Sequence, residues 1–203
     1  MTSILILGAG GHAKVVADIL IGQGIEVMGY LDDNPQTWNT KPLNIPVLGP
    51  THIYAQYEAD GMIIGIGSNI IRRSLVDQLG ADGRVSWANA IHHQSIIAPS
   101  VRLGVGLIIA AGAILTPDSV IGDHVIINTA ATVDHDCQIG AFCHIAPGSH
   151  LGGGVQVGEG TLIGIGATVL PYCKIGCNVT VGGGAVVVND IPDGMTVKGI
   201  PAR

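Results

Sequence analysis

From residue 91 to residue 187 an aliphatic side chain returns at every sixth position, and this period constrains the fold more than any other feature. Four residues after each of these positions stands a small or aliphatic residue, never a charged one or an amide. A six-residue period fits neither a 3.6-residue helix nor a long alternating strand; it indicates a short strand and a turn, repeated. Such units stack into a parallel β-helix with an aliphatic core. The aliphatic series is Ile91, Ile97, Leu103, Ile109, Leu115, Ile121, Ile127, Val133, Ile139, Ile145, Leu151, Val157, Ile163, Val169, Ile175, Val181 and Val187.

The composition agrees with stacked coils of this kind. One Phe and two Trp stand beside 31 Gly, and a narrow coil filled by aliphatic side chains leaves no room for large rings. Cys137, Cys143 and Cys173 fall on the small inward positions, so we interpret them as packing residues rather than a redox set. No CxxC pair is present, and the four cysteines are expected to be reduced thiols.

The first 80 residues follow a different pattern. The stretch SILILGAGGHAKVVADILIGQG predicts a buried strand, a glycine turn and an amphipathic helix, and IEVMGYLDD predicts a second strand that ends in two carboxylates. We expect a short helix in THIYAQYEADG, a third parallel strand in MIIGIGSN and a helix in IIRRSLVDQLG. The segment ADGRVSWANA, residues 81–90, is the expected crossover between the halves. The fold class is therefore a small Rossmann-like α/β domain followed by a parallel β-helix.

The first glycine turn has the character of a phosphate-binding loop. Gly8, Gly10 and Ala13 match G-x-G-x-x-A between strand and helix, and Asp32 ends the second strand. Glycine lets the backbone approach a phosphate, which then faces the amide groups of the helix. NAD is one ligand of such a turn, but this half is too short for two mononucleotide-binding units. A turn that only packs the helix on the strand is the alternative.

Charge and hydropathy exclude two classes of partner. The net charge is -6 with nine Lys and Arg, which leaves no basic stripe for nucleic acid. The opening ILIL is broken by GAGGH after four residues and has no basic segment before it, so we expect neither a signal peptide nor a membrane span. We therefore expect a cytoplasmic protein.

Taken together, the motifs resemble a known family over essentially the whole chain. The hexads IGDHVI, IGAFCH, VGEGTL, IGIGAT and IGCNVT are similar to the repeats of left-handed β-helix acyltransferases. With GAGGHAKVVADIL, YLDDN, GIGSNIIRR and the terminal VKGIPAR, they resemble the bacterial nucleotide-sugar N-acetyltransferases of the sialic-acid O-acetyltransferase and bacillosamine acetyltransferase group.

The resemblance implies a left-handed β-helix with three hexads per coil. It also implies two domains that bind separate ligands. Residues 1–85 would bind a UDP-sugar, and residues 86–203 would bind acetyl-CoA and carry catalysis. By motif position, Gly10, Gly11 and His12 would lie along the pyrophosphate and sugar. Asp32 and Asp33 would contact the uridine, and Gly67 would line the nucleotide pocket.

The segment DHD, residues 134–136, carries the candidate chemistry. Acetyl transfer to an amine needs a base, and an imidazole with an ordinary pKa near 6.5 is suitable when a carboxylate fixes its tautomer. Val133 and Cys137 point inward by register, so His135 between them is expected to point outward. One coil later the stacked position is Gly153, where a small residue would leave space for a substrate. The resemblance implies that His135 is the general base and Asp136 its partner; Asp134 stays unassigned.

The resemblance also implies the acetyl-CoA contacts. His144 would lie near the thioester in a site shared between neighbouring subunits of a homotrimer. Gly153, Ile165 and Gly183 would line the pantetheine arm, Gly153 through its backbone N–H.

We therefore predict an acetyltransferase that moves acetyl from acetyl-CoA to the C4 amine of a UDP-linked amino-dideoxy sugar by direct attack, with no metal. A dTDP- or GDP-linked amino sugar, O-acetylation of a sugar such as a sialic acid, and a nucleotide-sugar binding protein that has lost catalysis are alternatives. A minor one is a zinc β-helix enzyme like the γ-class carbonic anhydrases, with ligands drawn from His124, His135, His144 and His150.

Overall fold

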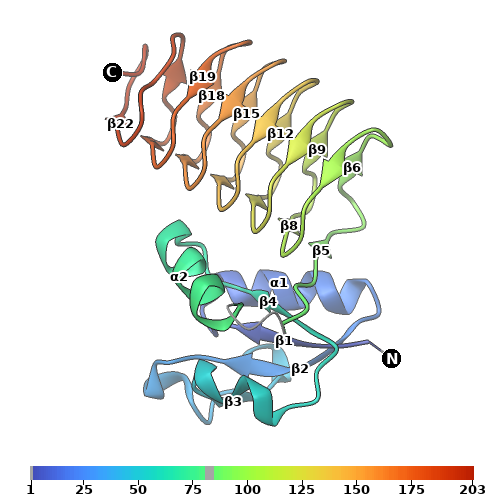
Figure 1. The fold of residues 1–203 in the computed structure, drawn as a ribbon. Helices are drawn as coiled ribbons and strands as arrows, with labels where there is room; N and C mark the ends of the chain where they lie inside the picture. The colour runs from blue at the N-terminus through green and yellow to red at the C-terminus, as the bar shows by residue number, and fades with distance from the viewer. Residues whose placement is uncertain (1, 81–84) are drawn as a thin grey trace. The chain divides into compact units, whose positions relative to one another are not determined.

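The computed structural model describes residues 2–80 and 85–203, which form two compact units, residues 1–93 and 94–203. Figure 1 draws the first unit as a sheet with helices and the second as a stack of coils. Of the expected crossover at residues 81–90, residues 81–84 lie outside the described part of the chain. The predicted combination of a Rossmann-like domain and a left-handed β-helix is confirmed.

The first unit is built on a parallel sheet of order β3-β2-β1-β4. Its pattern of strand, glycine turn, helix and strand is the one that the sequence predicts, but β3 was not expected, because three residues between two prolines give no periodic signal. The segment expected to be a short helix, THIYAQ, forms the 3₁₀ helix η3. The elements are β1 (Ser3–Leu7), α1 (Gly11–Gly22), β2 (Glu26–Leu31), η1 (Pro35–Thr37), η2 (Pro42–Asn44), β3 (Val47–Gly49), η3 (Thr51–Gln56), β4 (Gly61–Ile64), α2 (Asn69–Leu79) and β5 (Ala90–Ile91).

Helices cover both faces of this sheet. Leu75 of α2 packs in one core cluster with Leu5 and Leu7 of β1. Because successive side chains of a strand point to opposite faces, Ile6 faces the other side, where it lies beside Ala13 of α1 next to Gly65. The glycine turn after β1 and the loop after β4 therefore meet at the carboxyl end of the sheet.

The first unit extends past residue 85 because the chain adds one more pairing to its sheet. The backbone N–H of Met62 donates to the carbonyl of Ser86 at 2.8 Å, and Ala88 donates back to Met62 at 2.9 Å. Trp87 makes the corresponding parallel bridge to β4. The first unit therefore continues past residue 85 and ends at residue 93. The assignment of each ligand to residues 1–85 or 86–203 stays a prediction.

The second unit consists of two-residue strands that form three flat parallel sheets. The first sheet, called D here, contains β7 (Arg102–Leu103), β10 (Val120–Ile121), β13 (Gln138–Ile139), β16 (Gln156–Val157) and β19 (Lys174–Ile175). The second, sheet B, includes β8 (Ile108–Ile109), β11 (Ile126–Ile127), β14 (His144–Ile145), β17 (Leu162–Ile163), β20 (Thr180–Val181) and β22 (Thr196–Val197). The third, sheet C, contains β6 (Ile96–Ile97), β9 (Ile114–Leu115), β12 (Thr132–Val133), β15 (His150–Leu151), β18 (Thr168–Val169) and β21 (Val186–Val187).

From β6 to β21 each strand pairs with the strand eighteen residues away, so three hexads make one coil as expected; β22 pairs with β20 at a spacing of sixteen residues. Val133 pairs with Leu115 on one side and Leu151 on the other. Every aliphatic residue of the series from Ile109 to Val187 is buried. Ile97 and Leu103 are only half-buried, because their coil is the first of the stack. The six-residue period therefore predicted the core of this unit correctly.

From residue 106 to residue 184 the turns between the strands place one residue each, every sixth position, in the left-handed backbone region. Glycine takes this place at several turns, where a side chain would be strained. Asp136 also lies there, with φ 60°, and so does Tyr172, with φ 62°. No helix in residues 2–80 and 85–203 is long and apolar enough to cross a bilayer.

Candidate active site

The turn from sheet C to sheet D carries the candidate base. We call the stacked turns 116–119, 134–137, 152–155 and 170–173 the His135 corner. Backbone hydrogen bonds join these turns: Asp136 donates to Pro117 at 3.1 Å, and Gly154 donates to His135 at 2.8 Å. The turn that carries His135 is thus bonded to the turns of both neighbouring coils, and these bonds hold its backbone in place.

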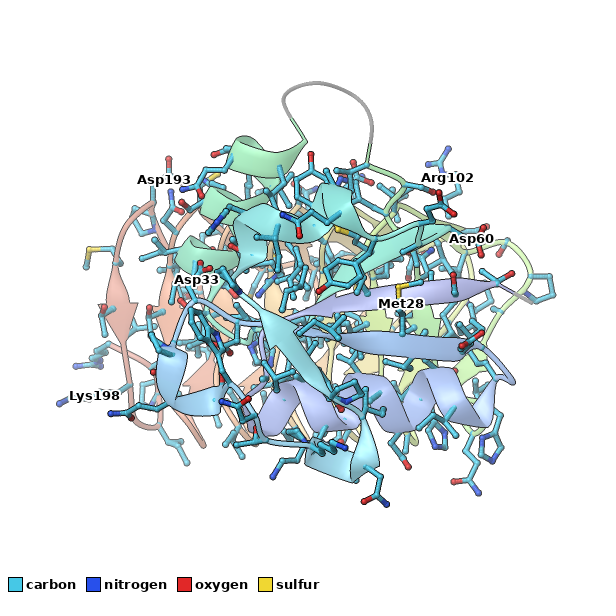
Figure 2. The ribbon with its side chains drawn as sticks, turned by 90° about the horizontal axis from the view of Figure 1, so that it is seen from below. Met28, Asp33, Asp60, Arg102, Asp193 and Lys198 are labelled. Carbon is cyan, nitrogen blue, oxygen red and sulfur yellow. The ribbon has the colours of Figure 1, made fainter. Side chains whose placement is uncertain are left out.

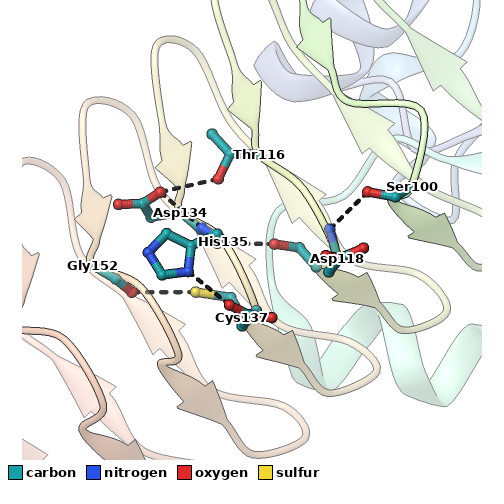
Figure 3. Close-up of polar contacts among 9 residues, drawn as sticks. Ser100, Thr116, Asp118, Asp134, His135, Cys137 and Gly152 are labelled. Carbon is teal, nitrogen blue, oxygen red and sulfur yellow. Dashed lines mark hydrogen bonds and ion pairs between the residues drawn. The ribbon is translucent and has the colours of Figure 1, made fainter.

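His135 and Asp136 form a hydrogen-bonded pair on the surface of this corner (Figure 3). Nδ1 of His135 lies 2.7 Å from Oδ2 of Asp136, and the two side chains are 52% and 65% exposed. A carboxylate only accepts, so Nδ1 carries the proton and Nε2 presents its lone pair. The hydrogen bond to Asp136 raises the pKa of His135 above its ordinary value, and the negative charges of Asp134 and Asp136 act in the same direction. The pair has the form of a general base with a carboxylate that orients it.

Asp134, on the other side of the histidine, has a different function. Its Oδ1 accepts the backbone N–H of His135 at 2.8 Å and the hydroxyl of Thr116, one coil away, at 3.0 Å (Figure 3). These donors, the His135 N–H first, hold the pKa of Asp134 below its ordinary value. The two aspartates of DHD therefore have different contacts: Asp136 bonds the imidazole of His135, and Asp134 holds the backbone of the turn.

Gly153 lies directly under the imidazole ring. A Cβ added at Gly153 would come within 2.5 Å of Nε2 and 2.6 Å of Cε1 of His135. The space that the sequence led us to expect over this glycine is thus filled by the base itself. Only glycine at this position allows the ring to keep its place.

The cysteines near the corner are packing residues, as expected. Cys137, Cys143 and Cys173 are buried. The thiol of Cys137 contacts the carbonyl of Gly152 at 3.3 Å, and burial raises its pKa to about 11. A thiol in this state is a poor nucleophile at neutral pH.

The other predicted acetyl-CoA contacts lie on a different side of the coil. His144 begins β14 in sheet B, which lies opposite the His135 corner, and its Nε2 is 3.0 Å from the amide nitrogen of Asn128. Ile165 is 67% exposed in the turn between sheets B and C. Gly183 lies one coil further, and a Cβ added there would come within 3.2 Å of the carbonyl oxygen of Ile165. Within one chain, only Gly153 of this set lies beside His135.

The four histidines of the zinc alternative are dispersed. His135 lies in its corner, His144 on sheet B and His150 on sheet C, where it contacts Thr132 at 2.9 Å. His124 is buried and stacks on Phe142 with ring centroids 5.2 Å apart. Within the described ranges, no three His, Cys, Asp or Glu side chains are grouped so that they could hold a metal ion.

In the first unit, the glycine turn opens α1 at the carboxyl end of the sheet. Gly8 has φ 97°, and a Cβ there would come within 2.6 Å of Ile66, so this position requires glycine. Gly10 is the N-cap of α1 without a side-chain hydrogen bond, and no atom lies within 4 Å of a Cβ built on Gly10 or Gly11. The open backbone at a helix N-terminus is suited to a phosphate.

A neutral histidine and a buried arginine stand beside this turn. Burial lowers the pKa of His12 to about 4, and the charge of Arg72 contributes, so His12 is a neutral donor or acceptor at pH 7. Arg72 of α2 is fully buried and donates to the carbonyls of Ile66 and Gly67 at 3.2 and 3.3 Å. Arg72 thereby holds the loop that contains Gly67.

The two aspartates after β2 already have structural partners. Asp32 accepts the backbone N–H of Ala9 at 2.7 Å and thus ties the glycine turn to the end of β2. Asp33 accepts the N–H and the hydroxyl of Thr51 at 2.7 and 2.8 Å. In Figure 2, Asp33 and Asp60 lie at opposite ends of the sheet, and Asp33 marks the end that carries the turn.

The sequence did not single out Arg72 or Asn128. Arg72 reads as one residue of an amphipathic helix, and its burial becomes visible only when the loop after β4 folds over it. Asn128 could have been found from its spacing, because it stands sixteen residues before His144 and directly follows β11, whose Ile126 pairs with His144.

Two family models match the chain. The PglD N-terminal domain matches residues 3–79, and the six-repeat bacterial transferase hexapeptide matches residues 118–153.

Solved structures match over the whole length. PerB of Caulobacter crescentus, in complex with CoA and GDP-perosamine, is 41% identical with a TM-score of 0.94, over 100% of this chain and 97% of that one. The acetyltransferase domain of PglB from Neisseria gonorrhoeae, in complex with acetyl coenzyme A, is 39% identical with a TM-score of 0.91, over 99% of this chain and 98% of that one.

Among curated relatives, the UDP-N-acetylbacillosamine N-acetyltransferase of Bacillus subtilis is 36% identical over 118 residues, 55% of this chain. The aligned region spans 52% of that protein. It spans 24% of an uncharacterized mimivirus protein that is also 36% identical. The chain thus matches about half or less of the length of these two relatives.

Proposed function

Because the chain belongs to the family of PglD-type hexapeptide-repeat sugar N-acetyltransferases, we propose that it transfers acetyl from acetyl-CoA to the amine of a nucleotide-linked amino sugar. The observation that carries this proposal is the exposed pair His135–Asp136, with Nδ1 and Oδ2 2.7 Å apart on the surface of the β-helix. The open glycine turn of the first unit supports a nucleotide diphosphate as the carrier of the sugar.

His135 is the general base in this proposal. Nε2 takes a proton from the sugar amine while Asp136 holds the ring in position and stabilises the imidazolium. The amine nitrogen forms a bond to the acetyl carbonyl carbon, the C–S bond of the thioester breaks, and the proton passes from His135 to the leaving thiolate. The buried cysteines, with a pKa of about 11 at Cys137, support direct attack rather than an acetyl-enzyme.

The proposed acetyl-CoA contacts require a second chain. His144, Ile165 and Gly183 lie on the side of the coil away from His135, while Gly153 lies beside it. An acyl donor that contacts both sets must lie between two copies of the chain. This division supports the homotrimer with shared sites, and we place the enzyme in the cytoplasm.

A UDP-linked 4-amino-4,6-dideoxy sugar is the proposed acceptor. The Bacillus relative is named for a UDP-sugar, whereas the PerB crystal holds GDP-perosamine, so a GDP-linked amino sugar is the second candidate. Asp32 and Asp33 are engaged with Ala9 and Thr51, and a carboxylate keeps further acceptor capacity for a base.

The test is an assay of thiol release from acetyl-CoA with a panel of UDP-, dTDP- and GDP-linked amino sugars. We expect release with at least one of them and a product that carries one acetyl group in an amide, which resists hydroxylamine. The same sugars with a hydroxyl in place of the amine are the matched control. Release with the hydroxyl sugars, to a hydroxylamine-labile ester, would establish the O-acetyltransferase alternative instead. Binding of nucleotide sugar without release from any of them would indicate a binding protein.

A further inference from the structure

One coil beyond Gly153 and Gly154, the His135 corner carries an exposed aromatic side chain. Tyr172 is 73% exposed, and its backbone N–H donates to the carbonyl of Gly153 at 2.9 Å. A Cβ added at Gly154 would come within 2.6 Å of Cδ1 of Tyr172. The phenol ring therefore lies on Gly154, as the imidazole of His135 lies on Gly153.

The backbone of Tyr172 is in an unfavourable conformation for such a residue. The stacked turns of this corner place Asp118, Asp136, Gly154 and Tyr172 in the left-handed region, with φ of 64°, 60°, 68° and 62°. Asp and Gly tolerate this region, whereas the Cβ of a bulky residue approaches the following carbonyl oxygen too closely. Strain of this kind persists where surrounding structure or function offsets it.

The ring of Tyr172 rests on Gly154 but is not enclosed by the chain, unlike the other aromatic ring of this unit. Phe142 and Tyr172 are the only Phe, Tyr or Trp residues in the sequence of residues 94–203, and Phe142, also left-handed at φ 60°, stacks on the buried His124. The ring of Tyr172 is instead largely exposed beside the catalytic pair. A ring in this place is suited to a ligand.

The chemistry on the two sides of His135 indicates which ligand. Toward the start of the β-helix the corner carries the polar side chains of Thr116 and Asp118, and Ser100 of the preceding turn accepts from the N–H of Asp118 at 3.0 Å. Toward the end it carries Gly153, Gly154 and the ring of Tyr172, so the ring and the imidazole both lie against backbone that bears no side chain. A hydroxylated sugar suits the first side, and the methylene-rich arm of an acyl thioester suits the second.

We propose that Tyr172 is a further substrate-contacting residue, whose ring packs against the pantetheine arm of the acyl-CoA donor as that arm crosses Gly153 and Gly154. This assignment rests on the proposed acetyltransferase function. It adds an aromatic contact on the same chain as the base, so the donor is held at the coil next to His135.

The test compares CoA binding by the wild type, Tyr172→Gly and Tyr172→Phe, measured by isothermal titration calorimetry on the full chain. Loss of a ring that packs on the ligand is expected to weaken CoA binding about tenfold in Tyr172→Gly, and Tyr172→Phe is expected to keep the affinity. Asn178→Gly is the matched control, because Asn178 has φ 54° in the following turn and carries no ring. We expect Tyr172→Gly to melt at the same or a higher temperature, since glycine relieves the strain.

Three results would overturn the role of Tyr172: equal CoA affinity in the wild type and Tyr172→Gly, an equal loss in Tyr172→Phe, or a changed sedimentation coefficient in Tyr172→Gly, which would assign the ring to subunit contact. In each of these cases the wild type still binds CoA and the proposed function stands. If the wild type itself bound no CoA, the proposed function would fail, and the role of Tyr172 with it.

Discussion

The substitution Gly153→Ala adds one methyl group at the point where the coil supports the imidazole of His135. Gly153 does not have a positive φ, so alanine fits its backbone, and the effect comes from the new Cβ alone. That atom would lie 2.5 Å from Nε2 of His135, whereas an unstrained contact is about 3.5 Å. The imidazole must therefore move by roughly 1 Å.

A displacement of this size should reduce turnover much more than stability. Misplacing a reacting group by about 1 Å costs on the order of 100-fold in rate. We expect the exposed His135 to turn away from the methyl and so to weaken the 2.7 Å hydrogen bond to Asp136, which is the main cause of its raised pKa. The pKa would then fall, and the acid limb of the kcat/KM profile would move to lower pH. The melting temperature should change by no more than about 2 °C, because the side chain that moves is on the surface.

The assay is the initial rate of thiol release from acetyl-CoA as a function of pH, for Gly153→Ala, His135→Ala and the double variant. Since the methyl acts through the imidazole, Gly153→Ala should have no further effect once His135 is removed. Gly22→Ala is the control: it adds the same methyl in α1, where the nearest atom, Nδ1 of His93, is 4.0 Å away, and should leave the rate unchanged.

Two results would refute this reasoning. One is a wild-type rate and pH profile in Gly153→Ala. The other is a further loss in the double variant, with a raised KM for acetyl-CoA, which would show that Gly153 acts on the donor directly and not through the base.

Three further predictions concern other parts of the molecule. Asp136→Asn removes the hydrogen bond that raises the pKa of His135, so kcat should fall about 100-fold and the acid limb should move to lower pH; a pH–rate profile measures both, and an unshifted limb would contradict the pair. Cys137→Ala should leave kcat unchanged and lower the free energy of unfolding by about 1 kcal/mol in a urea titration, whereas loss of turnover would reopen an acetyl-enzyme route. Arg72→Met removes a buried cation that donates to the carbonyls of Ile66 and Gly67 and to the amide oxygen of Asn69, so the free energy of unfolding should fall by about 3 kcal/mol. The pKa of His12, followed by NMR, should then rise from about 4 but stay below 6.5 because burial remains; an unchanged value would show that the charge of Arg72 does not reach it.

The sequence was sufficient for the β-helix because its period has a direct physical meaning. A residue that returns every six positions returns to the same side of the coil, so the inward places of Val133 and Cys137 and the outward place of His135 followed from counting. The first glycine turn was also predicted from the sequence, and the structure shows why Gly8 is required there: an added Cβ would come within 2.6 Å of Ile66. The strand β3 was not readable, because three residues between prolines carry no period.

The sites themselves depended on contacts between segments far apart in the chain. Asp32 and Asp33 end a strand in the sequence, but only the fold shows that they accept hydrogen bonds from Ala9 and Thr51. Arg72 belongs to a surface helix by its pattern, yet the loop after β4 folds over its guanidinium.

By itself, then, the sequence determined the repeat, the core of the coils and the exposure of His135, because these follow from local periodicity. Only the tertiary structure decided that Asp134 turns to Thr116 one coil away, and that the imidazole of His135 rests on Gly153. The physical reason is that a period fixes the direction of a side chain within its own coil, whereas its partners lie eighteen residues away and are set by the stacking of one coil on the next.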